Sequence, residues 1–208
     1  MDESARSPRQ HSEAHELVAV ILLSLVAVLT AWCGFEAAKW GGDSSVAFSE
    51  ASAARIEASD FESQARDARS VDLAVYTQWV LAGANENAEL AEYIEERFSP
   101  EFSVAFDAWQ SDGKQEQGPF ATEEYVPPGT VQGAEATERA NALQTDALDF
   151  NEKGDNYSLM TVLFALVLFL AAIAQRGISL LASRIVLGLA GVLALTGLIV
   201  LFTFPIRL

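Results

Sequence analysis

The sequence predicts an all-α membrane protein: three transmembrane helices, with an extracytoplasmic antiparallel four-helix bundle inserted between the first and second spans. Three observations lead to this prediction. Half of the 208 residues are hydrophobic, yet 20% are charged. The apolar residues gather in three uncharged runs, 17–35, 157–174 and 185–204, each close to the roughly 20 residues that a helix needs to cross a bilayer. Between the first two runs lies a polar segment, 36–156, with helical periodicity.

The first run, 17–35, has two interpretations, an uncleaved membrane anchor or a cleaved signal peptide. It is longer than the roughly 7–15 apolar residues of a signal peptide. The N-terminal tail, residues 1–16, also carries four acidic residues against two arginines. Both features favour the anchor. Trp32 and Trp40 near the outer end of this run are typical of the membrane–water interface.

The second run, 157–174, contains no charge, proline or glycine. As a helix it is about 27 Å long, against a hydrocarbon core of about 30 Å. The polar stretch before it, from about Thr130, has no proline, so we expect a helix that continues down to the bilayer. Gly154 offers a point at which this helix can break.

Small side chains recur at helical spacings in the first and third runs, and such faces let membrane helices approach closely. They either pack the three spans on one another or contact a second copy or another membrane protein. The residues are Ser24, Ala27, Ala31, Gly34, Gly188, Gly191, Ala194 and Gly197.

Basic residues in short segments predict the orientation, because Lys and Arg favour the cytoplasmic side. The link 175–184 carries Arg176 and Arg184 and no acidic residue, and the N-terminal tail carries two arginines. We therefore expect a multi-pass protein of the inner or plasma membrane, with a cytoplasmic N-terminus. Residues 36–156 are then extracytoplasmic, together with the C-terminal tail, 205–208, although Arg207 argues for the opposite side.

The polar segment 36–156 is expected to form four helices joined by one long loop. Gly41 and Gly42 are expected to end the helix of the first span. Gly83 is expected to end the first helix of the polar segment. Ser99 followed by Pro100 is typical of an N-cap and first helical position. The predicted ranges are about 43–82, 85–98, 100–111 and 130–156, with the loop at 112–129.

An aromatic stripe runs along the third of these helices at spacings of three and four. Such rings are usually core, because each buries about 150–250 Å²; the alternative is a surface that binds a partner. The candidate core or interface residues are Phe98, Phe102, Phe106, Trp109 and, from the first helix, Trp79.

Charge excludes one class of partner. The net charge is −16, and the segment 36–156 alone holds 25 acidic and 8 basic residues. Such a segment repels phosphates, so we expect no nucleic acid partner. The expected partners are the lipid bilayer and either a membrane protein or a second copy of the chain.

The sequence predicts no catalytic, cofactor-binding or metal-binding residue. Segment 36–156 has no histidine, the residue most used in acid–base catalysis. His11 and His15 share a helix face but lack further ligands. The single cysteine, Cys33, is expected to be an inert apolar residue. The glutamates between Glu86 and Glu96 have no glycine-turned calcium loop and are expected to form a solvated face.

Several motifs carry a resemblance to a known group. They are Leu29-Thr30-Ala31-Trp32-Cys33-Gly34-Phe35-Glu36-Ala37-Ala38-Lys39-Trp40, Thr77-Gln78-Trp79, Arg97-Phe98-Ser99-Pro100-Glu101-Phe102 with Phe106-Asp107-Ala108-Trp109, Pro119-Phe120-Ala121 and Asn156-Tyr157. On these motifs the chain, from about residue 17 onward, resembles a family of small bacterial integral membrane proteins with no assigned function. The resemblance implies the order span, helical outer segment, span, short link, span, and transfers no site residue.

Two functions are consistent with these observations. The first is a non-enzymatic membrane protein whose acidic outer segment serves partner binding, sensing or assembly of an envelope complex. The alternative is an accessory or structural subunit of an oligomeric transporter or channel complex. Transport by this chain alone is disfavoured, because the three predicted spans contain none of the ionisable residues that usually mark ion paths.

Overall fold

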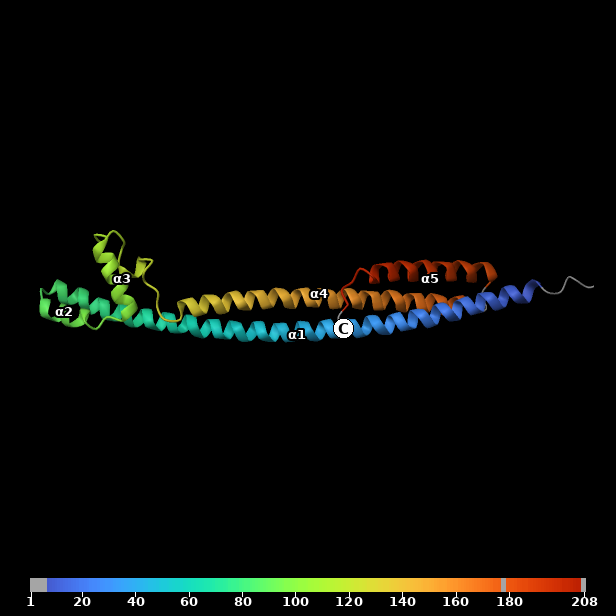
Figure 1. Ribbon diagram of the computed structural model, residues 1–208, viewed down its shortest axis with the longest axis horizontal. Helices are drawn as coiled ribbons and strands as arrows, with labels where there is room; N and C mark the ends of the chain where they lie inside the picture. The colour runs from blue at the N-terminus through green and yellow to red at the C-terminus, as the bar shows by residue number, and fades with distance from the viewer. Residues whose placement is uncertain (1–6, 177–178, 207–208) are drawn as a thin grey trace, which may run out of the picture. The chain divides into compact units, whose positions relative to one another are not determined.

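The computed structural model describes residues 7–176 and 179–206, and side chains from residue 17 onward except that of residue 180. This part of the chain is helical and contains no strand, so the predicted all-α class is confirmed. The elements are α1 (Ser7–Ala84), α2 (Ala88–Glu95), α3 (Pro100–Ser111), the 3-10 turn η1 (Pro119–Ala121), α4 (Thr130–Ala174) and α5 (Leu180–Leu201) (Figure 1). Three of them, α1, α4 and α5, contain stretches long and apolar enough to cross a membrane.

Contacts divide the chain into two compact units. Unit 1 combines the residues up to Ala47 with those from Thr145 onward. Unit 2 is Phe48–Gln144. The helices α1 and α4 each contribute residues to both units. Unit 1 therefore holds the three candidate spans, and unit 2 holds α2, α3 and η1.

In unit 1, α1 and α4 lie side by side in opposite directions (Figure 1). The Ser44 hydroxyl donates a hydrogen bond of 2.9 Å to the carbonyl of Ala147, and further along the same pair Val26 and Val167 share one buried cluster. The third helix, α5, folds back along α4. A Cβ atom on Gly197 would lie 3.0 Å from the Phe164 ring, so this glycine permits the close approach of α5 to α4.

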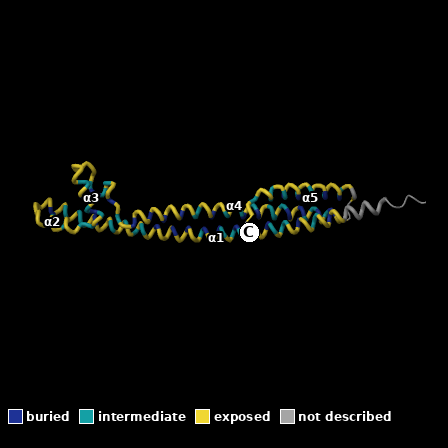
Figure 2. Tube along the Cα trace, viewed as in Figure 1, coloured by how far each residue is buried: buried dark blue, intermediate teal, exposed yellow. Residues whose placement is uncertain are grey.

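In unit 2, alanines form the seam between α1 and α4. Ala51, Ala54 and Ala58 on α1 are buried, as are Ala136 and Ala140 on α4. Buried positions recur along both helices, as Figure 2 shows. Spacings of three and four keep these small side chains on one face of each helix. The seam therefore buries little apolar area per residue but brings the two backbones close together.

The predicted break at Gly41 and Gly42 is wrong, because α1 continues through both residues. Each glycine costs the helix about 1 kcal/mol relative to alanine. The flanking residues Trp40 and Ser44 are buried in unit 1, and their packing offsets that cost. Gly154 does not interrupt α4 either. A Cβ atom there would lie 3.5 Å from the backbone of α1, so Gly154 marks a close helix–helix contact.

The finer prediction of an antiparallel four-helix bundle is not confirmed. In unit 2, α1 and α4 pair lengthwise, but α2 has 8 residues and α3 has 12. At about 1.5 Å per residue these helices are too short to run along such a pair. Instead, rings of α3 pack against Tyr76 and Trp79, near the end of α1.

Candidate functional site

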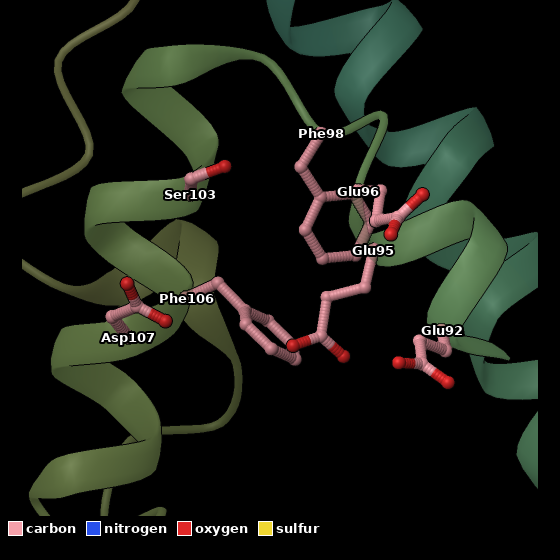
Figure 3. A pocket seen from close by; sticks show the side chains of 7 residues that line it. All are labelled: Glu92, Glu95, Glu96, Phe98, Ser103, Phe106 and Asp107. Atoms are coloured by element: carbon pink, nitrogen blue, oxygen red, sulfur yellow. The ribbon is translucent and has the colours of Figure 1, made fainter. Parts of the chain in front are cut away.

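A groove in unit 2, between α2 and α3, is the candidate site. We call it the α2–α3 groove; its volume is about 320 Å³. Figure 3 shows side chains of both helices directed into it, acidic groups on both sides and phenyl rings between them. The lining residues are Glu92, Glu95, Glu96, Phe98, Ser103, Phe106 and Asp107.

Helix α2, with its C-cap residue Glu96, provides three of the four carboxylates. It begins after Asn87, whose side-chain oxygen accepts a hydrogen bond from the Leu90 amide. Glu92, Glu95 and Glu96 then share one face, because residues three and four apart are neighbours on a helix surface. The indole Nε1 of Trp79 on α1 donates a hydrogen bond of 3.2 Å to Glu95. This bond ties the acidic face of α2 to α1.

Helix α3 forms the opposite wall. Ser99 caps it by accepting a hydrogen bond of 3.1 Å from the Phe102 amide, and Pro100 occupies its first position. This is the cap that the sequence predicts. Ser103 and Asp107 lie four residues apart and therefore on the same face. Both line the groove, with Asp107 exposed to solvent.

The floor of the groove belongs to an aromatic cluster. The Phe98 and Phe106 centroids are 5.1 Å apart, and Trp79 lies 4.9 Å from Phe106, with both ring pairs close to edge-to-face. Such pairs add about 0.5–1.5 kcal/mol each beyond the area that they bury. The rings of the cluster are those of Tyr76, Trp79, Phe98, Phe102, Phe106, Trp109, Phe120 and Tyr125. The rings behind the groove therefore pack on one another, and Phe106 is almost fully buried.

The structure brings the sequence-predicted aromatic residues together in this cluster. Phe102 and Phe106 are buried, and Phe98, Trp109 and Trp79 are half-buried. Burial in this cluster also raises the pKa of Tyr76. Core and interface roles coexist here, because Phe98 and Phe106 belong to the core and also line the groove.

The lining of the groove is negative and contains no lysine or arginine. Beside the groove, Arg97 forms an ion pair with Glu96 at 3.5 Å, between side chains that are both largely exposed to solvent, so the pair contributes little to stability. The Arg97 guanidinium lies over the Tyr93 ring, 3.5 Å from its centroid. Carboxylates beside aromatic rings attract cations by charge and by the ring quadrupole.

The four carboxylates do not converge on one point. Among the side chains that the structure describes, from residue 17 onward, no group of three or more His, Cys, Asp or Glu residues is arranged to hold a metal ion. The side chains of His11 and His15 lie outside the described part of the chain. The groove thus presents several separate negative charges.

The small-residue faces on α1 and α5 in unit 1 differ in how far they are buried. On α5, Ala194 and Gly197 are buried, while Gly188 is exposed and Gly191 is half-buried. All four residues on α1 are exposed, and no atom lies within 4 Å of a Cβ built on Gly34. We call these four, Ser24, Ala27, Ala31 and Gly34, the α1 small-residue face. Within the described part of the chain, no other span packs on this face.

Sequence reasoning missed the burial of Glu36. It lies one residue beyond the predicted first span, and its side chain is fully buried in unit 1. The spacing carries a signal: Glu36 follows Cys33 by three residues and precedes Trp40 by four, and both are buried. A carboxyl group is therefore part of the helix packing at this end of the spans.

The groove itself was also missed, because the glutamates of α2 were assigned to a solvated face. The pattern Glu92, Glu95, Glu96 directly before the phenylalanine stripe is the signal that the sequence contained. Comparisons of the chain with protein-family models, with curated proteins and with solved structures find no match. The resemblance to a family of small bacterial membrane proteins therefore stays a prediction.

Proposed function

We propose that this chain is a non-enzymatic integral membrane protein whose acidic outer domain, residues 36–156, binds a positively charged partner. The observation that carries the proposal is the α2–α3 groove, where four carboxylates and no basic side chain surround an aromatic floor. Such a lining favours a positively charged partner. In this proposal the N-terminus is cytoplasmic and the groove is extracytoplasmic.

The chemistry of the lining supports binding over catalysis. The groove offers carboxylates and the Ser103 hydroxyl, and residues 36–156 contain no histidine to act as general base. The proposal therefore assigns the groove to recognition. A sensor or an assembly factor would use the same site, because both require only binding.

Photo-crosslinking in intact cells tests this proposal. A photoreactive amino acid replaces Ser103 in the groove or, as the control, Ser59, which is exposed on α1. We expect an adduct at position 103 that disappears when Glu92→Gln and Asp107→Asn are added, and no adduct at 59. An adduct that persists without these two charges, or equal labelling at both positions, contradicts the proposal.

A second candidate function is that of a subunit in an oligomeric transporter or channel complex. It is favoured by the α1 small-residue face, which is exposed in unit 1. Membrane helices associate through small residues that let their backbones approach. In this alternative a helix of another subunit covers the face, and the outer domain is an accessory to the complex.

A further inference from the structure

We propose that a groove between α1 and α5 holds one acyl chain of a bilayer phospholipid. We call it the α1–α5 groove; it lies within unit 1, and its volume is about 350 Å³. Helix α1 contributes Val28, Leu29 and Trp32 to its lining, and α5 contributes Leu198 and Leu201. The inference requires that these apolar helices cross a membrane, and it does not depend on the α2–α3 groove.

The residues that follow α5 complete the groove, because Phe202 and Ile206 also line it. The hydroxyl of Tyr157 on α4 donates a hydrogen bond of 3.0 Å to the carbonyl of Pro205. The Phe204 ring packs edge-on against Tyr157, with the two centroids 5.3 Å apart. Tyr157 is fully buried, so both contacts hold the end of the chain against α4. The groove is therefore formed by the protein itself before any lipid enters.

The surroundings of the groove determine what fills it. Helices α1, α4 and α5 all contain stretches long and apolar enough to cross a membrane, and Trp32 is typical of the end of such a span. Among the described residues that line the groove, none is charged. A water molecule would find too few polar partners there, and an empty groove would leave its lining without contacts on one side. The bilayer supplies acyl chains at this depth.

The lining is accessible to such a chain. Val28 is 68% exposed and Phe202 is 81% exposed, while Leu29, Leu198 and Leu201 are half-buried. The exposed side chains form the rim of the groove, and the half-buried side chains lie deeper between the helices. An acyl chain in the groove therefore contacts leucines that lipid around the protein reaches less easily.

The size of the groove favours an acyl chain over a helix of a second copy. A helix about 10–12 Å in diameter, with a pitch of about 5.4 Å, occupies about 420–610 Å³ per turn. One turn is thus larger than the whole groove of about 350 Å³. A helix can cover the mouth of the groove, but an unbranched chain can lie inside it. Lipid tails are as apolar as leucine, so packing and the high concentration of chains in the bilayer drive this binding.

Photolabelling tests the inference. The full-length chain is placed in nanodiscs of phosphatidylcholine, a small fraction of which carries a diazirine near the middle of one acyl chain. After irradiation, mass spectrometry of the peptides locates the adducts. Lipid that only surrounds the protein labels residues according to their exposure, so Val162 on α4, 68% exposed, should exceed the half-buried Leu198 and Leu201. A chain held in the groove reverses this order, which is the result we expect.

A groove-filling variant and a matched control sharpen the test. Val28→Trp adds a large ring at the rim of the groove. Val162→Trp is the control, because Val162 has the same exposed fraction as Val28 and does not line the groove. We expect Val28→Trp to reduce the adducts on Leu198 and Leu201 several-fold and Val162→Trp to leave them unchanged. Circular dichroism checks that both variants remain helical.

Three results would overturn the inference. Labelling of the parent chain in proportion to exposure would show that only surrounding lipid contacts the groove. An equal loss of adducts in both variants, or no loss in Val28→Trp, would show that the chain is not held there. Unlabelled leucines together with crosslinks between two copies would assign the groove to a second copy. The order of labelling in the parent needs no variant, so it decides the question even if Val28→Trp fails to fold.

Discussion

The hydroxyl of Tyr125 donates a hydrogen bond of 2.9 Å to Oδ2 of Asp72, a carboxylate that is only 5% exposed. Tyr125 belongs to the segment between α3 and α4, and Asp72 belongs to α1. Arg69 lies close by, with its guanidinium carbon 6.0 Å from the centroid of the Tyr125 ring. Within unit 2, this buried polar contact fixes the α3–α4 segment against α1.

Tyr125→Phe should destabilise unit 2 by about 1.5–3 kcal/mol, because a buried carboxylate loses its hydrogen-bond donor. The expected result is a lower midpoint of thermal unfolding and faster amide hydrogen exchange in residues 112–129. Tyr93→Phe is the matched control, since Tyr93 is 55% exposed and none of the described hydrogen bonds uses its hydroxyl. Equal effects of the two substitutions would show that the Asp72 contact contributes nothing specific.

The same contact predicts how stability depends on alkaline pH. Burial raises the pKa of Tyr125, and the hydrogen bond to Asp72 and the charge of Asp72 raise it further. Above the ordinary tyrosine pKa, near 10, the unfolded chain loses this proton while the folded chain keeps it. Stability is therefore fully present below pH 10 and falls as the pH rises beyond it. Tyr125→Phe should make this fall shallower, and an unchanged slope in denaturant titrations would contradict the assignment.

Gly129 is predicted to tolerate no side chain. Its φ is +91°, and a Cβ atom there would lie 2.5 Å from the Phe61 carbonyl oxygen. Gly129→Ala should lower the midpoint of thermal unfolding, with a cost of at least about 1–2 kcal/mol from the backbone conformation alone. Gly133→Ala is the control, because its Cβ would meet Phe61 at an ordinary 3.5 Å and would add helix propensity. A decrease of equal size in both variants would refute this account of Gly129.

The long apolar runs were predictable from sequence because a helix across a bilayer requires about 20 apolar residues, a signal that needs no tertiary information. The N-cap at Ser99 was also predictable, because it depends only on residues next to it in the sequence. The passage of α1 through Gly41 and Gly42 was not, because it depends on the burial of Trp40 and Ser44 in unit 1. Tertiary packing there outweighs local propensity.

The candidate site was harder to predict from the sequence than the fold. The aromatic stripe on α3 indicated a core, but its partners Tyr76 and Trp79 lie more than 20 residues earlier in the chain. Periodicity gives the face of each helix without saying which two faces meet. The α2–α3 groove depends on how α2 and α3 pack on α1, which the sequence pattern does not give. From sequence alone, the acidic residues of α2 were therefore predicted to be ordinary solvated positions.

The proposed orientation makes a direct prediction for thiol labelling in intact cells. Ser111→Cys, at the end of α3, should react with a membrane-impermeant maleimide before the cells are opened. Ser179→Cys, exposed in the link between α4 and α5, should react only afterwards. The parent chain is the blank, because its one cysteine, Cys33, is buried. The reverse pattern of labelling would place the acidic domain in the cytoplasm.

The α1 small-residue face predicts a helix contact inside the membrane, which cysteine crosslinking can detect. Ala27 lies on this face, and Leu25 is exposed at nearly the same depth. At 100° per residue the two side chains point about 160–200° apart on α1. If another helix covers the face, a short bifunctional thiol reagent should join Ala27→Cys chains to each other or to a partner subunit and leave Leu25→Cys chains unlinked. Crosslinking at neither position would show that lipid covers the small residues of α1, and equal crosslinking at both would show a contact that is not specific to this face.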